Sequence, residues 1–198
     1  MRQLGLVSVL LVVACSGSGQ DSKPATGAAD AGAAAPASAP ASKAPKGMVA
    51  TVQSFVGLSE ATPPRRIEVM KALGQGFEVK DGTEKGSLQV IKDGAVLAEV
   101  FGDVSGNNID HVVTTSTEVA FPWDTHVGGR IGDHKHFDRM GCAMGSGRFS
   151  GKAVCHAFED HRFEYVIDLA GASAIPDQAA AGDLRIAAMV WRPKPVKP

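Results

Sequence analysis

The segment RFEYVIDL, residues 162–169, is the clearest strand signal in the chain and decides its fold class. Polar and apolar side chains alternate at its start, and aromatic and β-branched residues follow. This alternation indicates a strand that turns one face towards a core, as the strands of antiparallel sheets commonly do. The segment therefore predicts a domain built mainly of β-strands.

The chain carries further strand signals before and after this segment. They lie at residues 88–91, 95–101, 109–115 and 184–191. The first two flank Lys92, Asp93 and Gly94, and an Asp-Gly pair between two apolar runs is a strong hairpin signal. Pro193 prevents the last strand from continuing, because proline cannot donate to a sheet ladder. Together these segments predict a mostly antiparallel sheet.

Two short helices are expected beside the strands. Thr62 is suited to cap a helix and Pro63 to occupy its first position, while Gly74 ends it. A second short helix is expected over residues 134–140, with Asp133 as its cap. No internal repeat stands out. The predicted fold is mainly antiparallel β and sandwich-like, with one or two short helices, on the border of the α+β class.

The first residues have the pattern of an export signal. Arg2 gives a positive start, and residues 4–13 are an apolar run of about ten residues, about half of what a transmembrane helix needs. The run ends in aliphatic residues and Ala14, directly before Cys15, which resembles the lipobox of bacterial lipoproteins. The resemblance implies a signal peptide over residues 1–14 that is removed after Ala14. The alternative is an ordinary secretory signal followed by a chance cysteine.

The lipobox resemblance also implies a location. It implies a diacylglycerol on the sulfur of Cys15 and a fatty acyl chain such as palmitate on the new amino terminus. Each buried CH₂ contributes about 0.8 kcal/mol, so several chains hold a protein on a membrane almost permanently. Ser16 is not the aspartate that retains lipoproteins in the inner membrane of enteric bacteria. We therefore expect an envelope protein anchored by lipid in the outer membrane and facing the periplasm.

Composition divides the mature chain into a tether and a domain. Residues 15–46 are expected to be the lipidated cysteine and a disordered Ala/Pro/Gly tether, because the stretch after Cys15 has no large apolar residue to offset its ordering entropy. Residues 47–198 are expected to form a single β-rich domain with a short Pro-rich C-terminal tail. Without the signal, 19 basic side chains stand against 21 acidic ones, which argues against nucleic acid as a partner.

The cysteine count indicates a disulfide. Three cysteines would leave one thiol unpaired in an exported protein, but if Cys15 carries lipid, Cys142 and Cys155 remain as a pair. The oxidising periplasm favours a disulfide between them, and closing a loop of this length contributes about 3 kcal/mol. A redox-active pair is an alternative, although the Cys-x-x-Cys spacing is absent. Cu(I) binding by Cys142 with Met140 and Met144 is another.

A histidine-rich stretch is the strongest site-like cluster. His126 precedes DHKHFD at residues 133–138, and histidines with carboxylates suit zinc or copper. His134 and His136 would point to different faces of a helix, so only an extended or irregular segment would bring both to one metal. The three histidines are therefore weak metal candidates, and a solvated polar turn is the favoured interpretation. No cofactor is expected, and Ser146 lacks the Gly-x-Ser-x-Gly motif of many hydrolases.

The motifs follow one another in an order that is similar to a known family. They are VMKAL at 69–73, VIKDG at 90–94, IDHVV at 109–113, GRIGDHKHF at 129–137, Cys142, VCHA at 154–157, FEY at 163–165 and AMVWRP at 188–193. This set resembles the RpoE-regulated lipoproteins of the proteobacterial outer membrane, a family built on a domain of unknown function. The resemblance covers residues 57–193 and the lipobox. It implies a mainly β domain with Cys142 paired to Cys155, and no known catalytic residues.

The expected function follows from the anchor, the domain and the family resemblance. We expect a lipid-anchored β domain facing the periplasm, acting as a non-enzymatic binding or envelope-stress-related module for a protein, glycan or lipid partner. The alternative is a metal-binding or hydrolytic lipoprotein centred on His126, His134 and His136. The long Ala/Pro tether and the DHKH segment at residues 133–136 depart from the family.

Overall fold

The computed structural model describes residues 47–156 and 161–194, which lie within one compact unit spanning Pro40–Pro198. Residues 1–46, 157–160 and 195–198 lie outside the described residues. The expected signal peptide, Cys15, the expected tether and the end of the Pro-rich tail fall there. Within the described ranges, no helix is long and apolar enough to cross a membrane.

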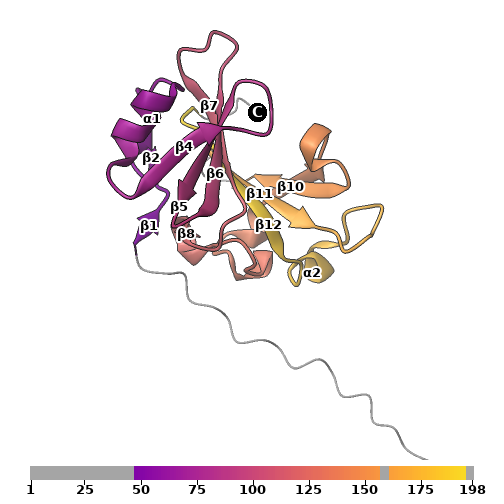
Figure 1. Ribbon diagram of the computed structural model, residues 1–198. Coiled ribbons are helices and arrows are strands. Elements are labelled where there is room, and N and C mark those ends of the chain that lie inside the picture. Colours follow the sequence, from indigo (N-terminus) through magenta and orange to yellow (C-terminus); the bar gives the residue numbers. More distant parts are fainter. Residues whose placement is uncertain (1–46, 157–160, 195–198) are drawn as a thin grey trace, which may run out of the picture. The chain divides into compact units, whose positions relative to one another are not determined.

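An eight-stranded antiparallel sheet forms the centre of this unit (Figure 1). Its strand order, β4-β5-β6-β7-β12-β11-β10-β9, joins two four-stranded meanders side by side through β7 and β12. The predicted fold, mainly antiparallel β and sandwich-like with few helices, is confirmed. The strands are β4 Phe77–Asp81, β5 Ser87–Lys92, β6 Ala95–Gly102, β7 Ile109–Thr114, β9 Gly141–Met144, β10 Lys152–His156, β11 Phe163–Asp168 and β12 Ile186–Trp191.

The predicted hairpin joins β5 to β6. Lys92 pairs with Ala95, and the two residues between them have positive φ, 50° at Asp93 and 80° at Gly94. These angles belong to a type I′ turn, whose twist matches that of the flanking strands and which favours Asp-Gly. The strands predicted at 109–115, 162–169 and 184–191 are confirmed, within one or two residues, as β7, β11 and β12.

Shorter elements connect and cover the sheet. β1 pairs in parallel with β8, and β2 pairs with β3. Their bounds are β1 Met48–Val49, β2 Ser54–Phe55, β3 Leu58–Ser59 and β8 Val119–Ala120, and the helical turns are η1 Pro122–Asp124, η2 Ile131–Asp133, η3 Phe137–Arg139, η4 Gly147–Phe149 and α2 Gln178–Ala181.

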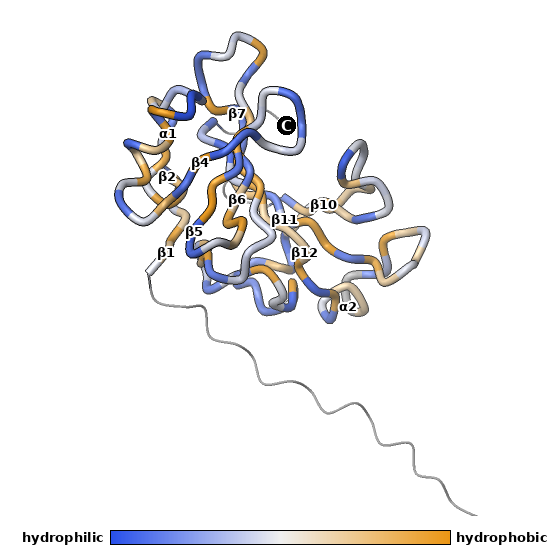
Figure 2. The backbone as a smooth tube through the Cα atoms, in the orientation of Figure 1, coloured by the Kyte–Doolittle hydropathy of each residue, from blue (hydrophilic) through white to orange (hydrophobic). Residues whose placement is uncertain are grey.

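Apolar side chains pack on both faces of the sheet. The larger core holds Trp191, Tyr165 and Phe163, each fully buried, and receives Phe55 from β2 and Phe121 next to β8. Figure 2 shows β5, β6 and β11 among the most hydrophobic stretches. Side chains alternate along a strand, so the opposite face, called the outer face below, holds a smaller cluster. That cluster is Val113, Val166, Ala188 and Val190, flanked by Phe101, Phe149 and Val154.

Helix α1, Arg66–Leu73, begins later than the sequence suggested. Thr62 does not cap it, because the Thr62 hydroxyl oxygen accepts a hydrogen bond from the backbone N–H of Ser59 at 3.0 Å. The Pro63-Pro64 pair explains the delay, since the residue before a proline is disfavoured in helical conformation. The helix ends at Gly74, where φ is 82°, as predicted.

Of the short helix predicted over residues 134–140, only the 3-10 turn η3, Phe137–Arg139, is formed. The turns η2 and η3 occupy this part of the chain, and neither has a side-chain cap, so Asp133 does not act as one. His134 lies between the two turns, and its Nδ1 accepts a hydrogen bond from the backbone N–H of His136 at 3.0 Å. This local bond offers the backbone an alternative to the helical pattern. The segment is therefore irregular.

Candidate functional site

A β-bulge in β7 creates the most polar cluster on the outer face. Phe101 of β6 pairs with His111, whereas the next residue, Gly102, pairs with Ile109, so Asp110 has no partner across the ladder. Such an extra residue re-aims side chains that would otherwise alternate between faces. Asp110 and His111 therefore meet, with Oδ2 of Asp110 2.6 Å from Nδ1 of His111.

The His111 ring is held on two sides. It stacks on the Phe101 ring, with 4.4 Å between the centroids and 8° between the planes, while Asp110 engages Nδ1. Burial lowers the pKa of His111, the hydrogen bond to Asp110 opposes this, and the positive charge of Arg192 lowers the pKa further. The ring is therefore neutral at neutral pH, and its Nδ1–H donates to Asp110. This leaves Nε2 as an acceptor.

Glu164 on β11 is the buried member of the same cluster. Its side chain is 6% exposed, and Nε of Arg192 donates to its Oε1 at 2.6 Å. Nη1 of the same guanidinium lies 3.4 Å from Oδ2 of Asp110. Nδ1 of His156 on β10 lies 4.0 Å from Oε1 of Glu164. These five residues, Asp110, His111, His156, Glu164 and Arg192, are called the outer-face network below.

The outer-face network pairs one guanidinium with two carboxylates and has exposed edges. Arg192 neutralises the buried carboxylate of Glu164 and reaches Asp110, whose side chain is 51% exposed. His156 is 36% exposed at the other side of the network, and its ring lies 6.5 Å from that of His161. The arrangement offers acceptors and imidazoles to a polar partner beside the apolar cluster of the outer face.

A second polar cluster fastens η4 to the other half of the sheet. Nη2 of Arg148 donates to Oε2 of Glu99 at 3.1 Å, and the guanidinium lies 4.5 Å from the Phe101 ring centroid. Glu99 also accepts hydrogen bonds from the Ser87 hydroxyl at 2.5 Å and from the backbone N–H and the hydroxyl of Thr83, each at 2.8 Å. Burial raises the pKa of Glu99, but these hydrogen bonds outweigh burial and lower it from 4.5 to about 2.

Two of the three candidate metal-binding histidines come together. The rings of His134 and His136 have centroids 6.1 Å apart, and Trp123 packs on both, at 4.9 and 6.0 Å. His126 belongs to a separate turn, with its Nδ1 3.4 Å from the backbone oxygen of Asp124. Within residues 47–156 and 161–194, no group of three or more His, Cys, Asp or Glu side chains is placed to hold a metal ion.

The packing of Trp123 explains an unusual backbone. Trp123 has φ 63° and Asp124 has φ 58°, so two consecutive residues other than glycine lie in the left-handed region. Such angles are costly for a bulky side chain. The contacts of the indole ring with His134, His136 and Phe163 hold it there. The turn therefore has a packing role.

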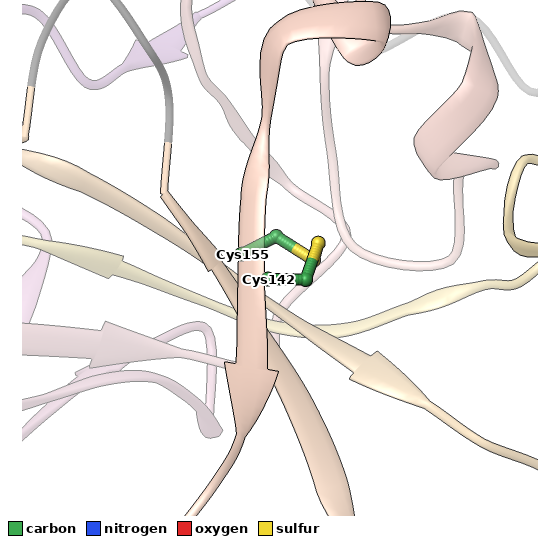
Figure 3. The surroundings of a disulfide bond; sticks show 2 residues. All are labelled: Cys142 and Cys155. Carbon is green, nitrogen blue, oxygen red and sulfur yellow. A yellow bond between two sulfur atoms is a disulfide. The ribbon is translucent and has the colours of Figure 1, made fainter. Parts of the chain in front are cut away.

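Cys142 and Cys155 form a disulfide between neighbouring strands (Figure 3), with 2.07 Å between the sulfur atoms. The two residues face each other across the β9–β10 ladder. Every residue of β9 is exposed, whereas Cys155 is buried in the larger core. The disulfide thus ties a strand with few buried contacts to the sheet. A bonded sulfur has no thiolate for Cu(I), which removes the basis of the Met140–Cys142–Met144 alternative. Ser146, the residue before η4, is exposed.

The outer-face network was not foreseen from the sequence. Strand alternation places Asp110 and His111 on opposite faces, and the bulge that brings them together has no local sequence signal. The buried position of Glu164 was partly predictable, because Val166 two residues later lies on the same face and is buried. A carboxylate on an apolar face indicates a buried partner. Nothing in the pattern identified Arg192 as that partner.

Comparison with known proteins finds a likeness among solved structures. No protein-family model matches the chain, and no curated protein matches it. Among solved structures, the chain is similar to the uncharacterized protein yfeY from Escherichia coli, with a TM-score of 0.52 and 16% sequence identity over 73% of this chain and 98% of that chain. At that identity the likeness shows the fold alone, and this chain is shown to share it with an uncharacterised bacterial protein.

Proposed function

We propose that this chain is a bacterial envelope lipoprotein, related to the RpoE-regulated outer-membrane lipoproteins, whose β domain faces the periplasm as a non-enzymatic binding module. The distribution of cysteines carries this proposal. The disulfide takes up Cys142 and Cys155, so Cys15, directly behind its apolar run and Ala14, is the cysteine that remains. Structural disulfides persist in oxidising compartments such as the periplasm. A cysteine in that position fits lipid modification.

The outer-face network supports binding as the activity. Arg192 contacts both of its carboxylates, so neither is a free general acid or base. Asp110 is 51% exposed and His156 is 36% exposed, so polar side chains of the network reach solvent. Polar, solvent-accessible side chains of this kind make up the rim of protein–protein interfaces. The binding surface that the geometry favours is therefore the outer face around Asp110.

Palmitate labelling tests the anchor. Cells that produce the chain are fed radioactive palmitate and then fractionated into periplasm, inner membrane and outer membrane. The mature chain is expected to carry label and to collect in the outer membrane, while a Cys15→Ser variant is unlabelled. A Cys142→Ser variant is the matched control and is expected to keep the label. The proposal is contradicted if the Cys15→Ser variant carries label, or if the chain without substitutions carries none.

Site-specific crosslinking tests the binding surface. A photoreactive amino acid is placed at Asp110, and in a second strain at Glu78 on β4, whose side chain is similarly exposed at 59%. Illumination of living cells is expected to link the domain to an envelope component from position 110 and not from position 78. The same products from both positions, or products from position 78 alone, overturn the assignment of the surface.

A further inference from the structure

Helix α1 presents apolar side chains to solvent as well as to the core. Val69 and Leu73 are buried, as expected for a helix packed against a sheet. Ile67 and Met70 lie outside this buried stripe and are 61% and 42% exposed. They are three residues apart, so they are neighbours on one helix face. Helix α1 therefore exposes two neighbouring apolar side chains next to its buried stripe.

The loop after β6 adds a third apolar side chain at the same end of the unit. Val104 in this loop is fully exposed, at 111%. A Cβ at Gly102, at the base of the loop, would lie only 3.0 Å from Cγ of Pro64, so the loop base packs against the start of α1. Figure 1 shows the loop and α1 near each other at the top of the view. Three of the six exposed large apolar residues in the described ranges belong to this region.

Cationic side chains flank these apolar residues. Arg66 and Lys71 stand on either side of Ile67 and Met70 along the helix, and Arg65 precedes them. Arg66 pairs with Asp81 at 2.6 Å and Lys71 with Glu68 at 3.1 Å, but all four side chains are 40% exposed or more. Exposed ion pairs of this kind contribute little to the stability of the fold, so Arg66 and Lys71 are able to leave these carboxylates for another anion. The long stems of Arg and Lys also lie readily along an apolar surface.

We propose that this surface, the α1 face, is where the domain rests on an anionic lipid bilayer. The α1 face consists of Ile67, Met70 and Val104 with Arg66 and Lys71. Exposed apolar side chains beside arginine and lysine are residue types that proteins place at the membrane interface. The apolar residues enter the boundary between headgroups and acyl chains, and the cations bind lipid phosphates.

The chain outside the structure argues for a bilayer as the occupant. This proposal rests on the proposed function, in which lipid on Cys15 anchors the chain. Residues 16–46 then join the anchor to β1, so 31 residues separate the lipid from the domain. A connection over so few residues raises the effective concentration of the domain at the bilayer to the order of millimolar. A surface of three apolar side chains and two cations is therefore sufficient, although it would bind weakly from solution.

Vesicle binding by the unlipidated protein tests the proposal separately from the anchor. The probe is the mature chain with Cys15→Ser, mixed with vesicles of phosphatidylethanolamine and phosphatidylglycerol and sedimented. The test variant carries Ile67→Glu and Met70→Glu, and the matched control carries Met144→Glu. Met144 is as exposed as Met70, at 45% against 42%, but lies on β9 at the opposite edge of the sheet from β4 and α1.

The test variant is expected to lose about tenfold or more in partition coefficient, and the control to stay within about twofold of the unsubstituted chain. Vesicles of phosphatidylcholine alone are expected to bind several-fold less. Equal binding by test variant and control, or no binding by the unsubstituted chain at any lipid concentration reached, overturns the proposal. A solution dimer that the test variant dissociates would assign the α1 face to a second copy and also overturn it. Thermal unfolding of each variant confirms that the substitutions at exposed positions leave the fold intact.

Discussion

Replacing Glu99 by glutamine is expected to destabilise the domain strongly at neutral pH. The Glu99 side chain is 10% exposed and accepts hydrogen bonds from Ser87, Thr83 and Arg148. Lowering its pKa from 4.5 to about 2 corresponds to about 3 kcal/mol of stability, at 1.36 kcal/mol per pH unit. Glutamine keeps the shape of the side chain but loses the charge, and its NH₂ cannot accept from these donors. We expect Glu99→Gln to lower the free energy of unfolding by about 2–4 kcal/mol at pH 7.

The lowered pKa of Glu99 also determines how the effect of Glu99→Gln on stability changes with pH. A depressed carboxyl pKa stabilises the fold above the unfolded value, and the stabilisation is lost as pH falls from about 4.5 to about 2. Urea unfolding of the Cys15→Ser chain with and without Glu99→Gln, at several pH values, measures it. The difference between the two is expected to shrink towards pH 2. Glu78→Gln, at a side chain that is 59% exposed, is the control and is expected to change stability by less than about 0.5 kcal/mol. If Glu99→Gln lowers the free energy of unfolding by less than about 1 kcal/mol at pH 7, or by the same amount at pH 7 and pH 2, the carboxylate of Glu99 does not stabilise the domain through its charge.

Three further predictions concern the disulfide, the outer-face network and the histidines. Removing the disulfide with Cys142→Ser and Cys155→Ser is expected to lower the free energy of unfolding by about 3 kcal/mol, and an unchanged urea midpoint would contradict its structural role. Arg192→Met leaves the buried carboxylate of Glu164 without its partner and is expected to cost about 3–5 kcal/mol, whereas adding Glu164→Gln restores much of this loss. If the double variant is no more stable than Arg192→Met alone, the pairing does not explain the cost. Isothermal titration with zinc is expected to give no heat at micromolar metal, and stoichiometric binding that His134→Ala abolishes would show that a metal site exists there.

Five of the eight strands of the sheet were predictable because their signals are local, whereas β4, β9 and β10 were not predicted. Alternation at residues 162–169 and the Asp93-Gly94 pair each specify an element without reference to the rest of the chain. The sequence also pointed to the pairing of Cys142 with Cys155, through the count of cysteines. β9 was missed because GCAM has no apolar alternation, and the strand is held at the sheet edge by its disulfide and ladder.

The errors at the helices and the site have a common physical cause. Thr62 and Asp133 are both residues that commonly cap helices, but Thr62 bonds to Ser59, and local bonding at His134 makes the segment after Asp133 irregular. The outer-face network combines side chains from three strands with Arg192, which directly follows β12, and its central pair depends on the bulge at Asp110. Such contacts are set by tertiary structure, which a pattern of residue types along one segment does not contain.

The proposed lipid on Cys15, which would hold this domain at a membrane, is tested by mass spectrometry of the amino-terminal peptide from membrane-extracted protein. The peptide is expected to begin at Cys15, with the mass of a diacylglycerol on sulfur and of a fatty acyl chain on the α-amino group. A mature chain that begins elsewhere, or a Cys15 that is unmodified in membrane-extracted protein, would contradict the account.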